Sequence, residues 1–153
     1  MTVDREVILR HLSDLKRCVG VLERHRDDTI DDLRADEDRL GAVLYWLQRA
    51  VQNVLDVAAH LVAASGGRFV EEYRAVVLEV GRLGLVGSDV AQRLADAAGF
   101  RNVSIHNYLE LDLAVVQEVL RSRLGDFAAF CAQVKARLGT GGTGSDPPPR
   151  PVT

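Results

Sequence analysis

The strongest constraint on the fold is a helical apolar repeat near the carboxyl end of the chain. Apolar residues follow one another at alternating spacings of three and four, as on one face of a helix with 3.6 residues per turn. The members of this stripe are Leu113, Val116, Leu120, Leu124, Phe127, Cys131, Val134 and Leu138. Asp112 directly precedes it, and its carboxylate can cap the first turn. The pattern predicts one long final helix over residues 112–138.

Four earlier segments carry the same kind of apolar stripe. We expect helices over about residues 3–26, 36–64, 70–83 and 88–98. The acidic stretch between the first two of these is predicted to be a polar connection. No segment alternates apolar and polar residues in the way of a β-strand. The sequence therefore predicts an all-α fold, an antiparallel bundle of four or five helices.

The composition changes after residue 138. Residues 139–153 are rich in Gly, Thr, Ser and Pro and have no apolar periodicity, so we expect a disordered tail. Residues 1–138 have the length of one domain with one core. Aromatic residues make up only 5% of the chain, so aliphatic side chains must fill most of that core.

The charge argues against a general nucleic-acid binder. The formal net charge is −3, whereas such proteins are normally basic. Any contact with RNA must therefore be local, or must be shared with a second subunit. Cys18 and Cys131 each lie among aliphatic residues, which favours free buried thiols over a disulfide. Free thiols fit a reducing cytoplasm. No apolar stretch is long enough to span a membrane.

A polar segment follows Gly99 between two amphipathic stretches. It contains Arg101 and His106, which are five residues apart and would lie about 140° apart on one unbroken helix. We therefore expect Gly99 to end a helix and Arg101 to lie in a turn beside a helix N-terminus. His106 would follow on the next helix, with Asn102 or Ser104 as its cap.

These residue types suit the cleavage of RNA. A neutral histidine can take the proton of a ribose 2′-hydroxyl, because its pKa lies near working pH. The attacking oxygen then closes on the adjacent phosphorus, while an arginine holds the added negative charge through two parallel hydrogen bonds. This chemistry requires no metal ion or cofactor, and its product is a 2′,3′-cyclic phosphate.

The motif resembles the signature of the HepT-like branch of the HEPN superfamily. That signature is Arg-x4-His-x-Tyr with Asn directly after Arg, and Arg101, Asn102, His106 and Tyr108 match it position by position. A helix ending in Gly-Phe precedes the motif, and Leu-Glu-Leu-Asp follows it before the long final helix. The resemblance covers residues 3–138 in helix order and residues 99–112 in sequence detail.

The resemblance implies a function, an assembly and a partner. HepT-like proteins are dimers whose two motifs face one cleft, and they act as ribonuclease toxins of toxin–antitoxin pairs, with transfer RNA described as a target. Their partner is a MntA-type nucleotidyltransferase, which transfers AMP to the motif tyrosine. Carried over to this chain, Arg101 and His106 would be catalytic, Asn102 would support them, and Tyr108 would accept AMP.

Other interpretations stay open at this point. The chain could be a metal-independent endoribonuclease toxin, a non-catalytic HEPN module that binds a nucleotide or a nucleotidyltransferase, or a plain helical dimerisation protein. Arg, His and Tyr in a loop are often ordinary surface residues. A nucleotidyltransferase encoded by a neighbouring gene would favour the first interpretation.

The remaining candidates are better explained by structure than by chemistry. His11 and His25 are predicted to be structural or solvated. His60 follows Asp56 by one helical turn, and we interpret this pair as a surface or inter-helix contact rather than part of the site. The pair Tyr45-Trp46 is predicted to belong to the core. No His and Cys cluster has the spacing of metal ligands.

Overall fold

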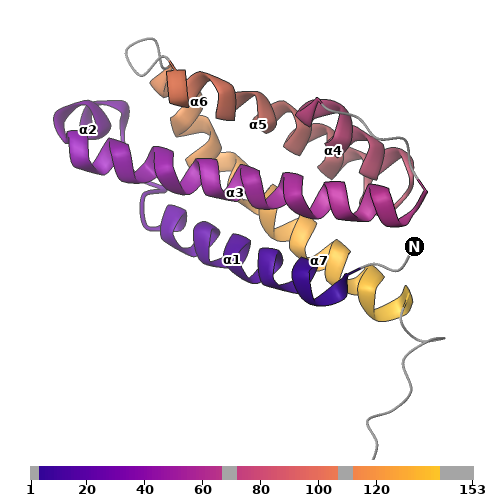
Figure 1. The fold of residues 1–153 in the computed structure, drawn as a ribbon. Helices are drawn as coiled ribbons and strands as arrows, with labels where there is room; N and C mark the ends of the chain where they lie inside the picture. Colours follow the sequence, from indigo (N-terminus) through magenta and orange to yellow (C-terminus); the bar gives the residue numbers. More distant parts are fainter. Residues whose placement is uncertain (1–3, 67–71, 107–111, 142–153) are drawn as a thin grey trace, which may run out of the picture.

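The computed structural model describes the backbone of residues 4–66, 72–106 and 112–141, and the side chains of residues 4–66, 72–97 and 112–139. These parts are helical and contain no strand, which confirms the predicted all-α bundle (Figure 1). The helices are α1 (Arg5–Glu23), α2 (Ile30–Ala35), α3 (Glu37–Ala64), α4 (Tyr73–Arg82) and α5 (Ser88–His106), followed by a run of α6 (Leu113–Glu118), η2 (Val119–Arg123) and α7 (Leu124–Gly141).

Side-chain caps explain where several helices begin. The Asp4 carboxylate accepts the Val7 amide at the start of α1, and Asp36 does the same for Arg39 at the start of α3. Asp112 accepts the Ala114 amide at 2.9 Å, which confirms its predicted role. The short helix α2 lies within the stretch predicted to be a connection. Thr29 starts this helix with a capping box. The six residues of α2 have only a weak apolar pattern, so the pattern did not predict the helix.

The helix α3 lies at the centre of the molecule. It packs against α1 on one side and against the antiparallel pair α4 and α5 on another, while α7 lies against α1, α3 and α5 (Figure 1). The predicted stripe of the last helix is buried in this core, with Cys131 and Leu138 at its edge. The largest fully buried side chains are Phe127, Phe130, Ile8, Leu12, Leu15, Leu22, Leu33, Leu47 and Leu120.

The final helical run differs from the prediction in two ways. It continues to Gly141, beyond the predicted end at residue 138, and residues 142–153 of the predicted tail lie outside the described residues. One π-helical turn, Val119–Arg123, interrupts it. The Arg26 guanidinium donates a hydrogen bond to the Arg121 carbonyl oxygen in that turn, at 3.4 Å. Within the described ranges, none of the helices combines the length and the apolar character needed to cross a membrane.

Candidate functional site

The helix α5 runs without a break from Ser88 to His106. The sequence predicted that Gly99 would end this helix and that Arg101 would lie in a turn beside a helix N-terminus. That prediction was wrong, because Gly99, Arg101, Asn102 and His106 all lie on the same helix. No cap at Asn102 or Ser104 is needed, since no helix restarts there.

The cost of one glycine inside a helix is small. One face of α5 buries Val90, Ala91, Leu94 and Ala95 in the core, and α4 lies along it. A glycine inside a helix costs about 1 kcal/mol relative to alanine. A cost of this size does not by itself end a helix.

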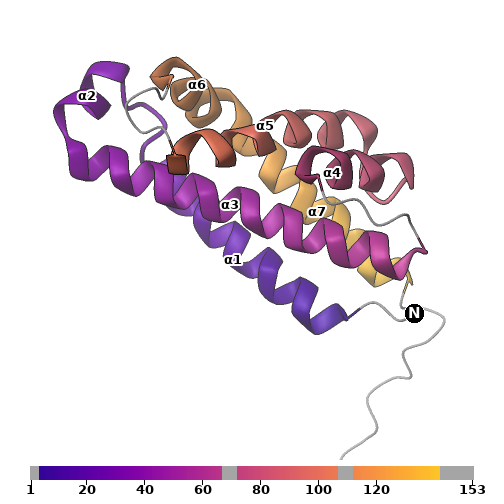
Figure 2. The same ribbon diagram turned by 45° about the horizontal axis from the view of Figure 1, so that its top comes forward.

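The continuous helix changes the register of the motif. Positions 101 and 106 lie about 140° apart around the helix axis, whereas positions 102 and 106 are four residues apart and share a face. The end of α5 that carries them lies at the end of the bundle where α3 begins (Figure 2). Tyr108 belongs to residues 107–111, which lie outside the described residues.

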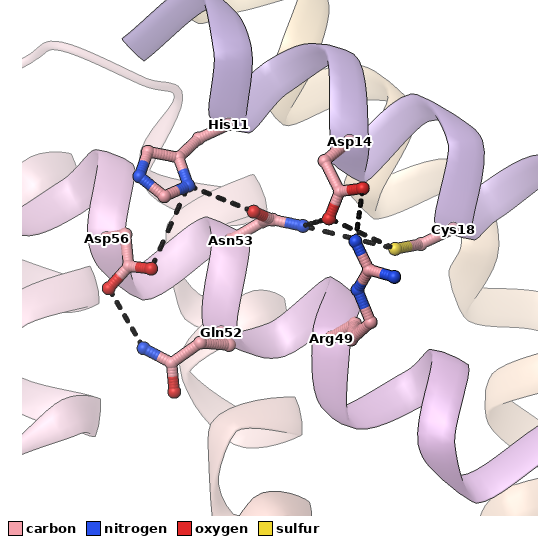
Figure 3. Close-up of polar contacts among 7 residues, drawn as sticks. All are labelled: His11, Asp14, Cys18, Arg49, Gln52, Asn53 and Asp56. Atoms are coloured by element: carbon pink, nitrogen blue, oxygen red, sulfur yellow. Dashed lines mark hydrogen bonds and ion pairs between the residues drawn. The ribbon is translucent and has the colours of Figure 1, made fainter. Parts of the chain in front are cut away.

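A polar network between α1 and α3 was not predicted (Figure 3). Asn53, which is 6% exposed, donates to Asp14 Oδ2 at 2.8 Å and contacts His11 Nδ1 through Oδ1 at 3.0 Å. Arg49 donates to the other oxygen of Asp14. Burial raises the pKa of the Asp14 carboxyl, but the hydrogen bonds from Asn53 and Arg49 outweigh it and hold that pKa below the usual 3.8.

The network continues toward an open hollow between the two helices. Asp56 lies 3.8 Å from His11 Nδ1 and accepts a hydrogen bond from Gln52 at 2.9 Å. Asp56 thus contacts His11, and the centre of the His60 ring lies 6.4 Å from that of the His11 ring. Ala59 and Ala63 complete the lining. In the described part of the chain, no three His, Cys, Asp or Glu side chains are grouped to hold a metal ion.

The other predicted structural residues have mixed outcomes. His25 is structural, because its ring nitrogen is hydrogen-bonded to Asp28 at 2.8 Å. Cys18 and Cys131 are free thiols, and burial raises the pKa of Cys18 to about 11, which keeps it protonated. Tyr45 is 53% exposed, so its assignment to the core was wrong.

The chain matches a known protein family and several individual proteins. The model of the family described as "Ribonuclease HepT-like" matches residues 8–134. The mRNA nuclease HepT of Shewanella oneidensis is 24% identical over 131 residues, which cover 86% of this chain and 98% of that protein. A putative RNase of Archaeoglobus fulgidus is 31% identical over 99 residues, or 65% of this chain and 74% of the relative.

Solved structures share the fold. A toxin–antitoxin complex with AMP-PNP contains a chain that superposes with a TM-score of 0.80 at 23% identity, over 86% of this chain and 99% of that one. The tri-AMPylated HEPN toxin of Shewanella oneidensis, in complex with its MNT antitoxin, gives a TM-score of 0.79 at 24% identity, over 86% and 98%. The helix order and the match over residues 8–134 together establish that this chain belongs to the HepT-like ribonuclease family, with the HEPN fold.

Proposed function

We propose that this chain is an endoribonuclease toxin that cleaves RNA without a metal ion and is restrained by a nucleotidyltransferase antitoxin. The observation that carries the proposal is the complete motif Arg101, Asn102, His106 and Tyr108 inside a family match over residues 8–134. The relative from Shewanella oneidensis is an mRNA nuclease, which supports RNA as the substrate class.

His106 and Arg101 have separate roles in the proposed reaction. His106 takes the proton of a ribose 2′-hydroxyl, and the freed oxygen attacks the adjacent phosphorus. Arg101 stabilises the negative charge that develops on the phosphoryl oxygens. The 5′-oxygen of the next nucleotide leaves and takes up a proton, so the products are a 2′,3′-cyclic phosphate and a 5′-hydroxyl. Asn102 shares a helix face with His106 and supports it.

A homodimer would complete this site. On one continuous helix, positions 101 and 106 lie about 140° apart around the helix axis. Two-fold symmetry would bring Arg101 of one copy toward His106 of the other, twice in the same cleft. It would also supply a second acid and a second phosphate clamp to a chain whose net charge is −3.

Tyr108 is the proposed point of control. The AMPylated HEPN toxin of Shewanella oneidensis forms a complex with its MNT antitoxin, which supports a similar partner here. An AMP group on Tyr108 would add a bulky anion beside Arg101. It would compete with the RNA phosphate for that arginine and fill part of the cleft.

Induced expression in bacteria, with and without a co-expressed MntA-type nucleotidyltransferase, tests the proposal. We expect growth arrest and new RNA ends with 2′,3′-cyclic phosphates only when the nucleotidyltransferase is absent. Purified protein should cleave RNA in the presence of EDTA. If the protein binds the nucleotidyltransferase but leaves all RNA intact, the chain is instead a non-catalytic HEPN module.

A further inference from the structure

Two arginines and two aromatic rings form a patch on the surface between α1 and α3. We call the group of Arg17, Tyr45, Trp46 and Arg49 the arginine–aromatic patch. The Arg17 and Arg49 guanidinium carbons lie 5.3 and 5.0 Å from the centre of the Trp46 ring. Arg49 also lies 5.7 Å from the Tyr45 ring, and the two rings meet edge to face at 5.2 Å. These distances are those of cation–π contacts and of an aromatic pair.

The patch is held in place by contacts on several sides. The Arg49 side chain donates one hydrogen bond to Asp14 and another to the Tyr45 hydroxyl oxygen, at 3.4 Å. Asp14 in turn is fixed by Asn53 from α3. The Tyr45 ring is therefore ordered before any ligand arrives, which lowers the entropy cost of binding.

One ring of the patch, Trp46, contributes to the core of the bundle, whereas the other, Tyr45, is exposed. Trp46 is half-buried and packs against the core, so it has a structural role. Tyr45 is 53% exposed, the most exposed large apolar side chain among the described residues. Arg17 is also exposed, and no carboxylate of the described residues forms an ion pair with it. An exposed ring and an exposed positive charge thus both contact Trp46.

The patch lies in the same half of the molecule as the motif. Tyr45, Trp46 and Arg49 belong to the first half of α3 (Glu37–Ala64). The end of α5 that carries residues 101–106 lies beside the beginning of α3 (Figure 2). The patch and the end of α5 thus lie along the same half of α3, the patch on the side that packs against α1.

We propose that the arginine–aromatic patch binds single-stranded RNA, with one base stacked on Tyr45 and a neighbouring phosphate held by Arg17. This inference deepens the proposed function and rests on it. A flat ring next to a guanidinium matches both parts of a nucleotide, its base and its phosphate. Bases in a duplex are stacked on one another and do not present a free face, so the patch selects single strands.

The binding experiment uses a probe that the proposed reaction cannot cut. A fluorescein-labelled 2′-O-methyl oligoadenylate lacks the 2′-hydroxyl nucleophile, so binding is measured by fluorescence anisotropy without cleavage. Trp46 is the only tryptophan of the chain, and a base that stacks on the patch should quench its emission. We expect quenching and anisotropy to saturate together, and the same sequence in duplex form to bind more weakly without quenching.

Matched variants separate stacking from charge. Tyr45→Ala should weaken binding about tenfold, whereas Tyr45→Phe should keep it, since stacking on one aromatic ring contributes about 1–3 kcal/mol per base. Arg17→Ala should lower the salt dependence of binding by about 0.7 in the log–log slope. Arg10→Ala is the control, because Arg10 is exposed on the same helix, its removal changes the net charge equally, and it is paired with Glu6 outside the patch.

The outcomes separate this inference from the proposed function. Equal binding by Tyr45→Ala and the parent, with unchanged Trp46 emission, overturns the patch even if the parent cleaves RNA. The inference is also overturned if the Trp46 emission decreases as the protein concentration rises, with or without RNA, and if the Tyr45→Ala variant is monomeric. These two results together would identify the patch as an interface between two copies. A parent that binds and quenches but never cuts RNA supports the patch and refutes the proposed catalysis.

Discussion

Asn53 on α3 donates a hydrogen bond of 2.8 Å to Asp14 on α1, and it does so from inside the core. Asn53 is the only polar residue that is buried among the described residues. Its amide oxygen lies 3.0 Å from His11 Nδ1, so both ends of the side chain are used. A buried amide is stabilising only while its hydrogen bonds are made, so Asn53 favours the relative position of the two helices in which both bonds form.

Replacing Asn53 should therefore destabilise the fold. Asn53→Leu fills a similar volume but removes the amide partners of Asp14 and His11, and we expect a loss of about 1–3 kcal/mol in the free energy of unfolding. Urea denaturation followed by circular dichroism measures it. Gln52→Leu is the matched control: Gln52 is a half-buried neighbour that donates to Asp56, and its loss should cost less than about 1 kcal/mol. Equal effects of the two variants would show that the network does not hold the helices together.

The Asp14 carboxyl should make stability depend on pH at the acid end. Its pKa in the folded protein lies below the usual 3.8, because hydrogen bonds from Asn53 and Arg49 outweigh burial. A lowered folded pKa means that the stabilisation is present above the unfolded pKa and is lost as the pH falls through the folded value. Thermal unfolding between pH 5 and pH 2 should thus show a smaller decrease in melting temperature for Asp14→Asn than for the parent. Asp38→Asn, at an exposed carboxylate, should retain the decrease of the parent.

The sequence predicted the long helices and the core because both follow from the apolar period. The final stripe from Leu113 to Val134 is buried as expected, and Asp112 caps it. The failures are local. Thr29 starts a helix too short to show a period. Gly99 was predicted to end a helix, but a glycine inside a helix costs only about 1 kcal/mol, and α5 continues through it. A sequence pattern indicates the secondary structure that a residue prefers, but it does not show the surrounding structure that decides the outcome.

The candidate site was recognised from its motif, whereas its surroundings were not. Arg101, Asn102 and His106 were selected from their chemistry and from the resemblance to the HepT-like signature, which do not give their register on a continuous helix. Tyr45 was assigned to the core because an aromatic residue on an apolar helix usually faces inward. In the structure the Tyr45 ring is exposed and its hydroxyl accepts a hydrogen bond from Arg49, which also donates to Asp14 on another helix. Contacts between helices of this kind form only in the folded chain.

The register of α5 leads to a prediction about the two catalytic residues. Arg101→Ala and His106→Ala should each lower the rate of RNA cleavage by at least about a hundredfold, because each removes an interaction of the transition state. Circular dichroism should show unchanged helix content. An alanine variant that cuts RNA at the rate of the parent would refute the role of that residue.

Mixing the two inactive variants tests whether the site is shared between copies. If Arg101 of one copy acts with His106 of the other, a heterodimer of Arg101→Ala and His106→Ala retains one intact site of two. Random exchange of subunits makes about half of the dimers mixed, so about a quarter of the parental activity should return. No recovery, after mass spectrometry has verified that subunits exchange, would place both residues in the same copy.

The last prediction concerns control through Tyr108. A MntA-type nucleotidyltransferase with ATP should add AMP to Tyr108, increase the intact mass by one AMP group per modification, and abolish cleavage. The phenolic oxygen would attack the α-phosphorus of ATP, and pyrophosphate would leave. Tyr108→Phe removes the acceptor but retains the ring, so it should still cleave RNA and should escape silencing by the nucleotidyltransferase. Peptide mass spectrometry locates the group. A fully silenced complex with an unmodified Tyr108, or a Tyr108→Phe variant that is silenced as well as the parent, would show instead that the partner inhibits by covering the site.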